Sequence, residues 1–241
     1  NAVMMQAGEA PLPGLNTADA LIGTGCLQLS NPVSDSSDDQ YAQLPAGVID
    51  YEDLTISLWV RPNNVFTWSR ILDFGAGTTD YLFITPNNGG NALRFAIRDD
   101  NGTEQMLTGP AVPVGQWSHI AFTLTGTTGR LYYNGELVAA NTSMSFNPID
   151  LAAAVNYLGK SQYTADPDFD GLIDDLKIYN YARSTVEIAQ EYLAVMGGSV
   201  CNREIYDMGM YDADGDCRIS LPDFAAFAAR WLEDDRIYPN P

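Results

Sequence analysis

The sequence is poor in positive charge and in histidine. Its 241 residues include 12 Lys and Arg against 31 Asp and Glu, which gives a formal net charge of −19, and it contains a single His. Nucleic-acid binding depends on cationic side chains that release counterions from phosphates, so this balance excludes a nucleic-acid ligand. An anionic membrane surface is excluded on the same grounds, and no apolar run approaches the roughly 20 residues of a membrane span.

Cysteine is also scarce. The chain has three cysteines, Cys26, Cys201 and Cys217, so one disulfide would leave one thiol over. Cys26, in the segment GTGCLQL, is predicted to be a small core residue. The sequence opens with Asn1 and shows no basic segment followed by an apolar one, so we expect a processed or excised part of a longer product.

Short runs of alternating apolar, aromatic and β-branched residues fill the chain from Asp53 to about Tyr181. Clusters of Gly, Asn, Pro and Thr separate these runs, as is typical of strands joined by turns. Asn134 and Gly135 tolerate positive φ and predict a tight hairpin. The predicted strands are 54–60, 69–74, 81–85, 93–98, 118–124, 130–133, 137–141, 157–160 and 172–179. Because no long helix intervenes, the pattern predicts an all-β sandwich or jelly roll.

The pattern changes after Ser184. Apolar residues recur at helical spacing over residues 186–193 and predict a short closing helix. Residues 196–199 contain two glycines and are predicted to form a linker. We therefore expect a β domain at 1–196 and a separate tail at 197–241.

Four blocks of the predicted β domain together resemble a known family. They are ISLWVRP at 56–62, GQWSHIAFTL at 115–124, RLYYNGELV at 130–138 and GLIDDLKIYNYARSTVEI at 171–188. Their order and spacing are similar to the bacterial laminin-G-like branch of the concanavalin A-like jelly rolls, over residues 21–194. The resemblance implies two stacked antiparallel sheets in a secreted module that binds carbohydrate or mediates adhesion, often beside a glycoside hydrolase.

The first strand of that family is missing from this sequence. The segment that begins at Asn1 resembles the part of the family that follows this strand. One explanation is a boundary of the chain. The other is an open sheet edge that takes a strand from a neighbouring subunit or from a cleaved upstream fragment, which would make the protein part of an assembly or filament.

The tail contains a motif with metal-ligand spacing. Residues 212–223 read DADGDCRISLPD and match the EF-hand calcium loop. Alternate side chains of a tight loop converge on one point, where a doubly charged cation offsets the repulsion among the carboxylates. The predicted calcium ligands are Asp212, Asp214, Asp216, the backbone carbonyl of Arg218, Ser220 and Asp223.

The segment after this loop, DFAAFAARWL, has its apolar residues on one helical face. Loop and helix together resemble a single dockerin-type calcium repeat of secreted bacterial polysaccharide-handling proteins. Dockerins that engage cohesins carry two repeats, so the resemblance does not extend to cohesin docking. The sixth loop position is Cys217 instead of Gly, which makes sense if Cys201 is its disulfide partner. That bond would close a loop of roughly 15 residues, stabilise the tail by about 3 kcal/mol and imply an oxidising compartment.

A second acidic stretch, residues 166–174, also resembles the start of an EF loop, but its twelfth position would be Lys177. The family resemblance assigns 171–179 to a strand. Some laminin-G-like domains hold a structural calcium near this Ile-Asp-Asp block, so Asp174 and Asp175 are second-choice metal ligands.

Catalytic patterns are missing. Glycoside hydrolases need two carboxylates that flank the bond, and the concanavalin A-like hydrolases carry them on one strand as Glu-x-Asp-x-Glu or Glu-x-Asp-x-x-Glu. No such block occurs. His119 lies in a core-strand block and is expected to be a buried, hydrogen-bonded structural residue, so Ser-His-Asp and Cys-His chemistry lack support. We expect a protein that is not an enzyme.

Sugar binding needs aromatic faces with amide or carboxylate partners. Trp68 and Tyr163 fall in predicted loops and are the candidates for such faces, with Asn87 and Asn88 as polar partners. The sequence thus indicates a secreted or surface-exposed, calcium-binding, non-catalytic module that recognises a polysaccharide or cell-surface glycan, or mediates adhesion. The alternatives are a structural subunit of an extracellular filament or complex completed by a strand from another chain, and an accessory fragment of a polysaccharide-degrading enzyme.

Overall fold

The computed structural model describes residues 3–6, 11–34, 39–99, 102–201, 212, 217 and 220–231. The chain divides into two compact units, Asn1–Gly197 and Gly198–Pro241. The described residues of the first unit form a β-sandwich with one α-helix, and those of the second include helix α2 (Leu221–Trp231).

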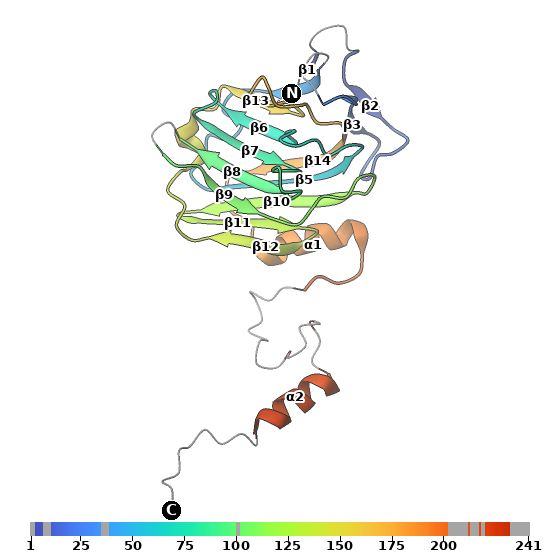
Figure 1. The fold of residues 1–241 in the computed structure, drawn as a ribbon, viewed down its shortest axis with the longest axis vertical. Helices are drawn as coiled ribbons and strands as arrows, with labels where there is room; N and C mark the ends of the chain where they lie inside the picture. Colours follow the sequence, from blue (N-terminus) through green and yellow to red (C-terminus); the bar gives the residue numbers. More distant parts are fainter. Residues whose placement is uncertain are drawn as a thin grey trace, which may run out of the picture. The chain divides into compact units, whose positions relative to one another are not determined.

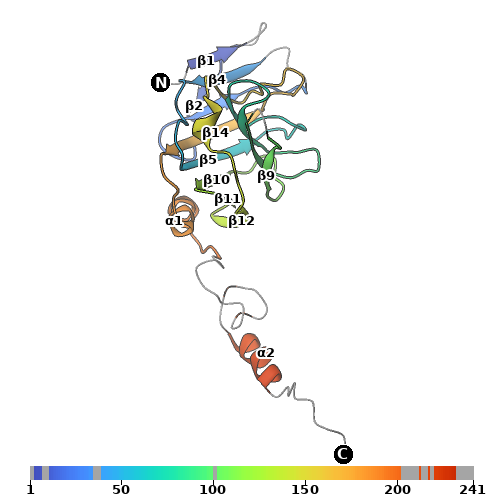
Figure 2. The ribbon, with the colours of Figure 1, turned by 90° about the vertical axis from the view of Figure 1, so that its left-hand side faces the viewer.

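The sandwich unit consists of two seven-stranded antiparallel sheets that lie face to face (Figure 1; Figure 2). Across the first sheet the strands are β1 (Val3–Gln6), β4 (Gln40–Leu44), β13 (Val155–Leu158), β6 (Leu72–Gly75), β7 (Tyr81–Thr85), β8 (Arg94–Arg98) and β9 (Gln105–Thr108). Across the second sheet they are β12 (Glu136–Asn141), β11 (Thr128–Tyr133), β10 (Ser118–Thr125), β5 (Leu54–Pro62), β14 (Gly171–Tyr179), β3 (Cys26–Leu29) and β2 (Gly14–Asn16). A short 3-10 helix, η1 (Pro148–Leu151), precedes β13.

The hydrophobic core fills the space between the sheets, and β5 shows why. Every second residue of this strand is apolar, and Leu54, Ile56, Leu58 and Val60 are all fully buried in the core. Each such side chain typically contributes about 1.5–3 kcal/mol to stability when it leaves water. The period of two that predicted the strands is therefore the period with which side chains enter the core.

Helix α1 (Thr185–Met196) follows the last strand and begins where the sequence predicts. Ser184 caps it, because its hydroxyl accepts a hydrogen bond from the backbone N–H of Glu187. The Glu187 carboxylate accepts in return from the backbone N–H of Ser184 at 2.8 Å, which completes a capping box. The helix ends at Gly197.

Helix α1 lies on the outer face of the second sheet (Figure 2). Ile188 packs there against Ala121 and Tyr132, and Trp59 stacks on Tyr192 with ring centroids 5.7 Å apart. The outer face of the first sheet carries no α-helix in the described part of the sandwich unit.

Ion pairs reinforce the attachment of helix α1 to the second sheet. Glu191 of α1 pairs with Lys177 at 2.9 Å and with Arg183. Burial would raise the pKa of Glu191, but His119 and Lys177 beside it hold that pKa well below its usual value. The carboxylate therefore stays ionised and fixes the helix to β14.

The predicted all-β sandwich is confirmed, and each of the predicted strands corresponds to an observed one: the ends of 81–85 are unchanged and the others are shifted at one or both ends. Asn134 and Gly135 have φ of 50° and 80° in the turn between β11 and β12, as the hairpin requires. The sequence did not reveal β1, β2, β3, β4 and β9, which are short and only partly buried. Such strands lack the alternation that marks a core strand.

Strand β1 forms one edge of the first sheet and pairs with β4 alone among the described strands. The addition of a strand from another chain at an open edge stays a prediction.

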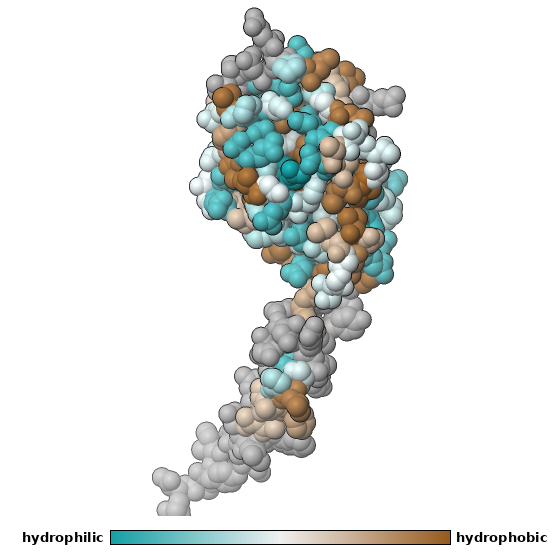
Figure 3. Space-filling model, turned by 90° about the vertical axis from the view of Figure 1, so that its right-hand side faces the viewer, coloured by the Kyte–Doolittle hydropathy of each residue, from teal (hydrophilic) through white to brown (hydrophobic). Residues whose placement is uncertain are grey.

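On the side shown in Figure 3, hydrophilic residues surround a hollow of the sandwich unit, and hydrophobic residues form smaller groups. No helix within the described ranges has the length and apolar character needed to cross a membrane.

The hairpin between β6 and β7 depends on Gly75. A Cβ at this position would lie 2.1 Å from the carbonyl oxygen of Asp80 and 2.9 Å from the Cα of Tyr81. We expect Gly75→Ala to lower the free energy of unfolding by about 2 kcal/mol, because the backbone must shift to admit the methyl group. Urea unfolding monitored by circular dichroism measures this change.

Gly14→Ala is the matched control, because a Cβ there meets nothing within 4 Å. It should change stability by less than about 0.5 kcal/mol. Equal losses in the two variants would show that the close approach at the hairpin is not what requires glycine.

Candidate functional site

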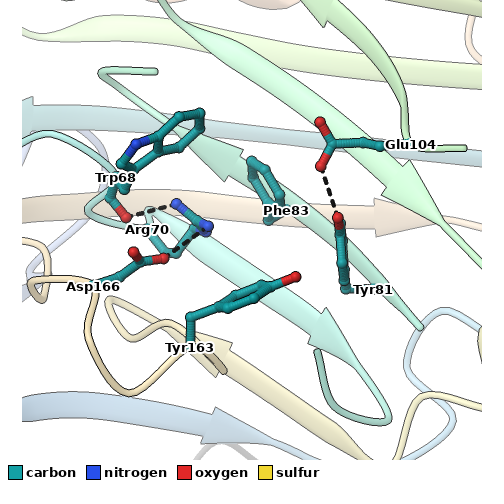
Figure 4. Close-up of a pocket in the computed structure, with 7 residues that line it drawn as sticks. All are labelled: Trp68, Arg70, Tyr81, Phe83, Glu104, Tyr163 and Asp166. Atoms are coloured by element: carbon teal, nitrogen blue, oxygen red, sulfur yellow. Dashed lines mark hydrogen bonds and ion pairs between the residues drawn. The ribbon is translucent and has the colours of Figure 1, made fainter. Parts of the chain in front are cut away.

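A cavity of about 210 Å³ opens on the outer face of the first sheet (Figure 4). Its walls come from strand β7 and from the connections β5–β6, β8–β9 and β13–β14. The lining residues are Trp68, Arg70, Tyr81, Phe83, Glu104, Tyr163 and Asp166. We call this cavity the aromatic–arginine pocket.

The floor of the pocket follows from the alternation of β7. Leu82 and Ile84 point into the core, so Tyr81 and Phe83 point to the outer face. Phe83 is nevertheless only 2% exposed, because Trp68 and the neighbouring rings pack over it. The strand therefore places an aromatic surface where a solvent-facing polar one is usual.

Arg70 is the central polar group. It is 3% exposed, and its guanidinium carbon lies 3.9 Å from the centroid of the Phe83 ring. Nη1 donates to the carbonyl oxygen of Trp68 at 2.6 Å, and Nη2 lies 2.9 Å from Asp166 Oδ2. Burial lowers the pKa of Arg70, while Asp73 and Asp166 oppose this shift. The guanidinium thus connects the floor with two of the loops.

Asp73 lies beneath the pocket and is fully buried. Its carboxylate accepts hydrogen bonds from the backbone N–H and the side-chain amide of Gln162, at 3.0 and 2.8 Å, and lies 3.6 Å from Arg70 Nε. Burial raises the pKa of Asp73 to about 6, although Gln162 and Arg70 lower it in part. This carboxylate supports the arginine from below.

A second polar group lies at the opposite wall. The Tyr81 hydroxyl donates to Glu104 Oε2 at 2.7 Å, and Arg94 Nη1 lies 3.7 Å from Glu104 Oε1. Burial and this hydrogen bond raise the pKa of Tyr81, so its hydroxyl stays protonated. The Arg94 guanidinium also lies 5.3 Å from the centroid of the Trp68 ring. Glu104 is thereby held at the rim.

Trp68 is held in a left-handed backbone conformation, with φ of 65°. Its backbone N–H donates to the carbonyl oxygen of Asn87 at 2.8 Å. The Asn87 side chain donates to the Val65 carbonyl and accepts from two backbone N–H groups, and Asn88 accepts from the N–H of Gly90. The two predicted polar partners thus shape the loops around Trp68 and do not line the pocket, whose polar groups are Arg70, Glu104 and Asp166 instead.

Tyr163 closes the pocket from the β13–β14 connection (Figure 4). Its hydroxyl donates to the Thr78 carbonyl at 2.8 Å, and its carbonyl accepts from the N–H of Asp166. The Ser161 hydroxyl donates to Asp166 Oδ2 at 3.0 Å. The structure therefore brings Trp68 and Tyr163, the two aromatic residues selected from the sequence, into one pocket from distant loops.

The tail residues predicted to hold calcium are only partly described. Asp214, Asp216 and Arg218 lie outside the described residues. Asp212 Oδ2 accepts from the backbone N–H of Cys217 at 3.0 Å, while Asp212 Oδ1 is buried and has no hydrogen-bond partner in the described part of the chain.

The other end of the predicted calcium loop also contains hydrogen bonds. Asp223 Oδ2 accepts from the backbone N–H and the hydroxyl of Ser220, at 2.7 and 2.9 Å. Cys217 has φ of 62°, the conformation that usually selects glycine at this loop position. The predicted disulfide between Cys201 and Cys217 is confirmed, with Cα atoms 5.6 Å apart.

The second-choice metal ligands have other roles. Asp174 Oδ2 accepts from the backbone N–H groups of Leu21 and Ile22 at 2.8 and 2.9 Å, which ties the N-terminal segment to β14. Asp175 has φ of 50° at a bulge of this strand and pairs with Lys177. Over the described residues, no group of three or more His, Cys, Asp or Glu side chains is placed to hold a metal ion.

His119 is fully buried, as predicted, but the expected hydrogen bond is not formed. Neither ring nitrogen has a hydrogen-bond partner among the described residues, and Nε2 lies 3.9 Å from Glu191 Oε1. The imidazole instead packs against Trp59 at 5.0 Å between ring centroids. Cys26 is buried, as expected of a core residue.

Comparison with known proteins identifies relatives of the sandwich unit. The Laminin_G_3 family model, described as the concanavalin A-like lectin/glucanases superfamily, matches residues 35–189. The Sushi, von Willebrand factor type A, EGF and pentraxin domain-containing protein 1 of Rattus norvegicus is 26% identical over 56% of this chain. The alpha-L-arabinofuranosidase of Bifidobacterium longum subsp. longum is 29% identical over 54% of this chain. The matches span 4% and 12% of those two proteins, so this chain corresponds to a small part of each.

Solved structures share the fold. One is domain 4 of AbnA, a GH43 extracellular arabinanase from Geobacillus stearothermophilus, in complex with arabinotriose. It has a TM-score of 0.63 and 22% identity, and the match covers 78% of this chain and 86% of that one. Another is the Ruminococcus gnavus IT-sialidase CBM40 bound to alpha2,3 sialyllactose, with a TM-score of 0.53, 21% identity and coverage of 59% and 83%.

The pH dependence of stability should report on Asp73. Its pKa of about 6 in the folded protein exceeds the ordinary value of 3.8, so the folded state takes up a proton at pH values where the unfolded chain does not. The stability that this proton uptake gives to the folded state is present in full below about pH 4 and is lost as the pH rises through 6. Compared with the Asp73→Asn variant, the wild-type protein should therefore gain about 1 kcal/mol of stability between pH 7.5 and pH 5.

Urea unfolding at the two pH values measures this difference. The exposed Asp150→Asn variant removes the same charge elsewhere and should keep the wild-type pH dependence. If Asp73→Asn also keeps it, the buried carboxyl is not the group that titrates near pH 6.

Proposed function

The chain belongs to the concanavalin A-like lectin/glucanase superfamily, and from this premise we propose that its sandwich unit is a non-catalytic carbohydrate-recognition module whose binding site is the aromatic–arginine pocket. The observation that carries the proposal is the combination of aromatic faces and charged hydrogen-bonding groups on an open sheet face. Sugars present apolar C–H faces and polar hydroxyl edges, and Trp68 and Tyr163 match the first while Asp166 and Glu104 match the second.

The solved relatives support this proposal. The arabinanase domain is in complex with arabinotriose and CBM40 is bound to sialyllactose, so the same fold holds sugars in both. One sequence relative is an arabinofuranosidase of which this chain matches a small part. These likenesses favour the role of an accessory module within a larger polysaccharide-degrading or adhesive protein.

The contacts of the pocket favour binding over catalysis. A glycoside hydrolase needs one carboxyl group that donates a proton to the leaving oxygen. Asp166 and Glu104 face the same pocket, but in the described contacts both act as acceptors, from Arg70 and Ser161 and from Tyr81 respectively. These acceptor contacts support a binding role for both carboxylates.

We further propose that the tail binds calcium and that the protein acts outside the cell. The predicted loop of residues 212–223, resembling a dockerin-type repeat, supplies the ligand series, and Asp212 Oδ1, buried and without a hydrogen-bond partner among the described residues, supports a cation there. The Cys201–Cys217 disulfide supports an oxidising compartment.

Removal of the Trp68 ring tests the binding site. We expect Trp68→Ala to weaken glycan binding by roughly ten- to a hundredfold, because an aromatic residue that stacks on a ligand dominates the affinity. A glycan array identifies a ligand, and isothermal titration calorimetry measures its affinity for the variant.

Tyr51→Ala is the matched control, since it removes an exposed aromatic side chain that does not line the pocket. It should bind like the wild-type protein. Unchanged affinity in Trp68→Ala would place the sugar elsewhere on the molecule.

Calcium binding can be tested on the whole chain by native mass spectrometry and by calorimetry. Asp212→Asn removes the ligand at the first loop position and should weaken calcium binding by roughly tenfold or more. Asp150→Asn, an exposed change of the same kind in the sandwich unit, should have no effect. A wild-type protein that binds no calcium would refute the proposed metal site and leave the sugar site unaffected.

A further inference from the structure

The charges that line the pocket are unequal, and its cation is already paired. Among the described residues that line it, Arg70 is the one cation, against the carboxylates of Glu104 and Asp166. Arg70 Nη2 lies 2.9 Å from Asp166, and its Nε lies 3.6 Å from Asp73. Arg94, beside the pocket, lies 3.7 Å from Glu104. Each of these guanidinium groups therefore already faces a carboxylate.

A ligand meets the carboxylates before it meets the arginine. The side chains of Glu104 and Asp166 are 26% and 19% exposed, whereas that of Arg70 is 4% exposed. The Arg70 guanidinium also lies over the Phe83 ring at the floor of the pocket and donates to the Trp68 carbonyl. The accessible polar surface of the pocket thus consists largely of hydrogen-bond acceptors.

An acidic sugar would face two costs in this pocket. Its carboxylate would lie beside Asp166 and Glu104, and like charges repel most strongly where water is excluded. To reach Arg70 it would have to displace Asp166, which would leave that carboxylate without its buried partner. The net charge of −19 adds repulsion of anionic glycans at longer range.

Hydroxyl groups face neither cost. A hydroxyl donates one hydrogen bond and accepts others, so it can donate to the Asp166 or Glu104 carboxylate without displacing an ion pair. Hydrogen bonds to a charged acceptor are the stronger ones. An uncharged polyol therefore suits the accessible acceptors.

The size of the pocket limits how much of a glycan it can hold. Its volume of about 210 Å³ lies below the roughly 300–1,000 Å³ of sites that enclose drug-sized ligands. Walls from three separate loops and from β7 surround this space (Figure 4). The volume corresponds to one sugar unit and not to an extended oligosaccharide.

From these charges and this volume we infer that the pocket binds a single uncharged sugar unit and discriminates against uronic and sialic acids. The inference rests on the proposed carbohydrate-binding function and narrows it to a substrate class. The CBM40 that is bound to sialyllactose shares the fold, and the ligand class inferred here differs from that sugar.

Pairs of sugars that differ only at C6, where a carboxylate replaces the hydroxymethyl group, test the inference on the full chain. Calorimetry compares galactose with galacturonic acid, glucose with glucuronic acid and mannose with mannuronic acid, together with arabinose, xylose, fucose and N-acetylneuraminic acid. We expect at least one uncharged sugar to bind and every acid to bind roughly tenfold or more weakly than it. An acid that binds as tightly as the best uncharged sugar overturns the inference and upholds the proposed function, whereas binding of none overturns both.

A charge variant tests whether the pocket carboxylates cause the discrimination against acidic sugars. Asp166→Asn releases Arg70 from its partner, so the affinity for the acidic sugars should rise roughly tenfold relative to that for the uncharged ones. Glu104→Gln acts at the opposite wall and should also raise the ratio of the affinity for acidic sugars to that for uncharged sugars. Glu136→Gln removes the same charge from an exposed site on β12 and should leave the ratio unchanged.

Thermal unfolding shows which variants are folded. If either pocket variant is folded and keeps the wild-type ratio of affinities for acidic and uncharged sugars, the charge argument is overturned. If neither variant folds, the comparison of sugars on the wild-type protein decides alone. Disaccharides and trisaccharides of the bound sugar test the size argument, and their affinities should stay within about threefold of the monosaccharide. A tenfold rise with each added unit would show that more than one unit is held.

Discussion

The pocket depends on the buried guanidinium of Arg70. It lies on the ring of Phe83, donates to the carbonyl of Trp68 and pairs with Asp166, so it joins one strand to two separate loops. A charge out of water is tolerated only with such partners, and Asp73 below supplies another. The arginine and its partners therefore hold one another in position. A site organised in this way exists before its ligand arrives, which reduces the entropy lost on binding.

The two outer faces of the sandwich are buried by different means. On the second sheet helix α1 covers Trp59 and Tyr132, and the helix is capped, stacked and ion-paired in place. On the first sheet the rings of Tyr81 and Phe83 are covered by side chains from loops. A helix can cover a sheet but leaves little room beside it, whereas loops can leave a cavity. The two faces differ because the described sandwich has a single α-helix, which covers one of them and leaves the other to loops.

Features that repeat along the chain could be predicted, and features that depend on distant partners could not. Core strands such as β5 carry a period of two, and Trp68 and Tyr163 stood out as aromatic residues between strands. Arg70 gave no signal, because its partner Asp166 follows much later in the sequence and meets it only through the fold. Asn87 was selected for its amide, which an asparagine uses as readily to shape its own loop as to bind a sugar.

Helix α1 also determines how mechanical load passes through the molecule. The chain leaves the sandwich through this helix before it enters the second unit. Glu191 connects the helix to Lys177 on β14, and Tyr192 stacks on Trp59 of β5. Tension on the tail therefore reaches two interior strands, which cannot be peeled away without breaking hydrogen bonds on both sides. A protein held by its tail would keep the first sheet, and the aromatic–arginine pocket on it, outside the path of the force.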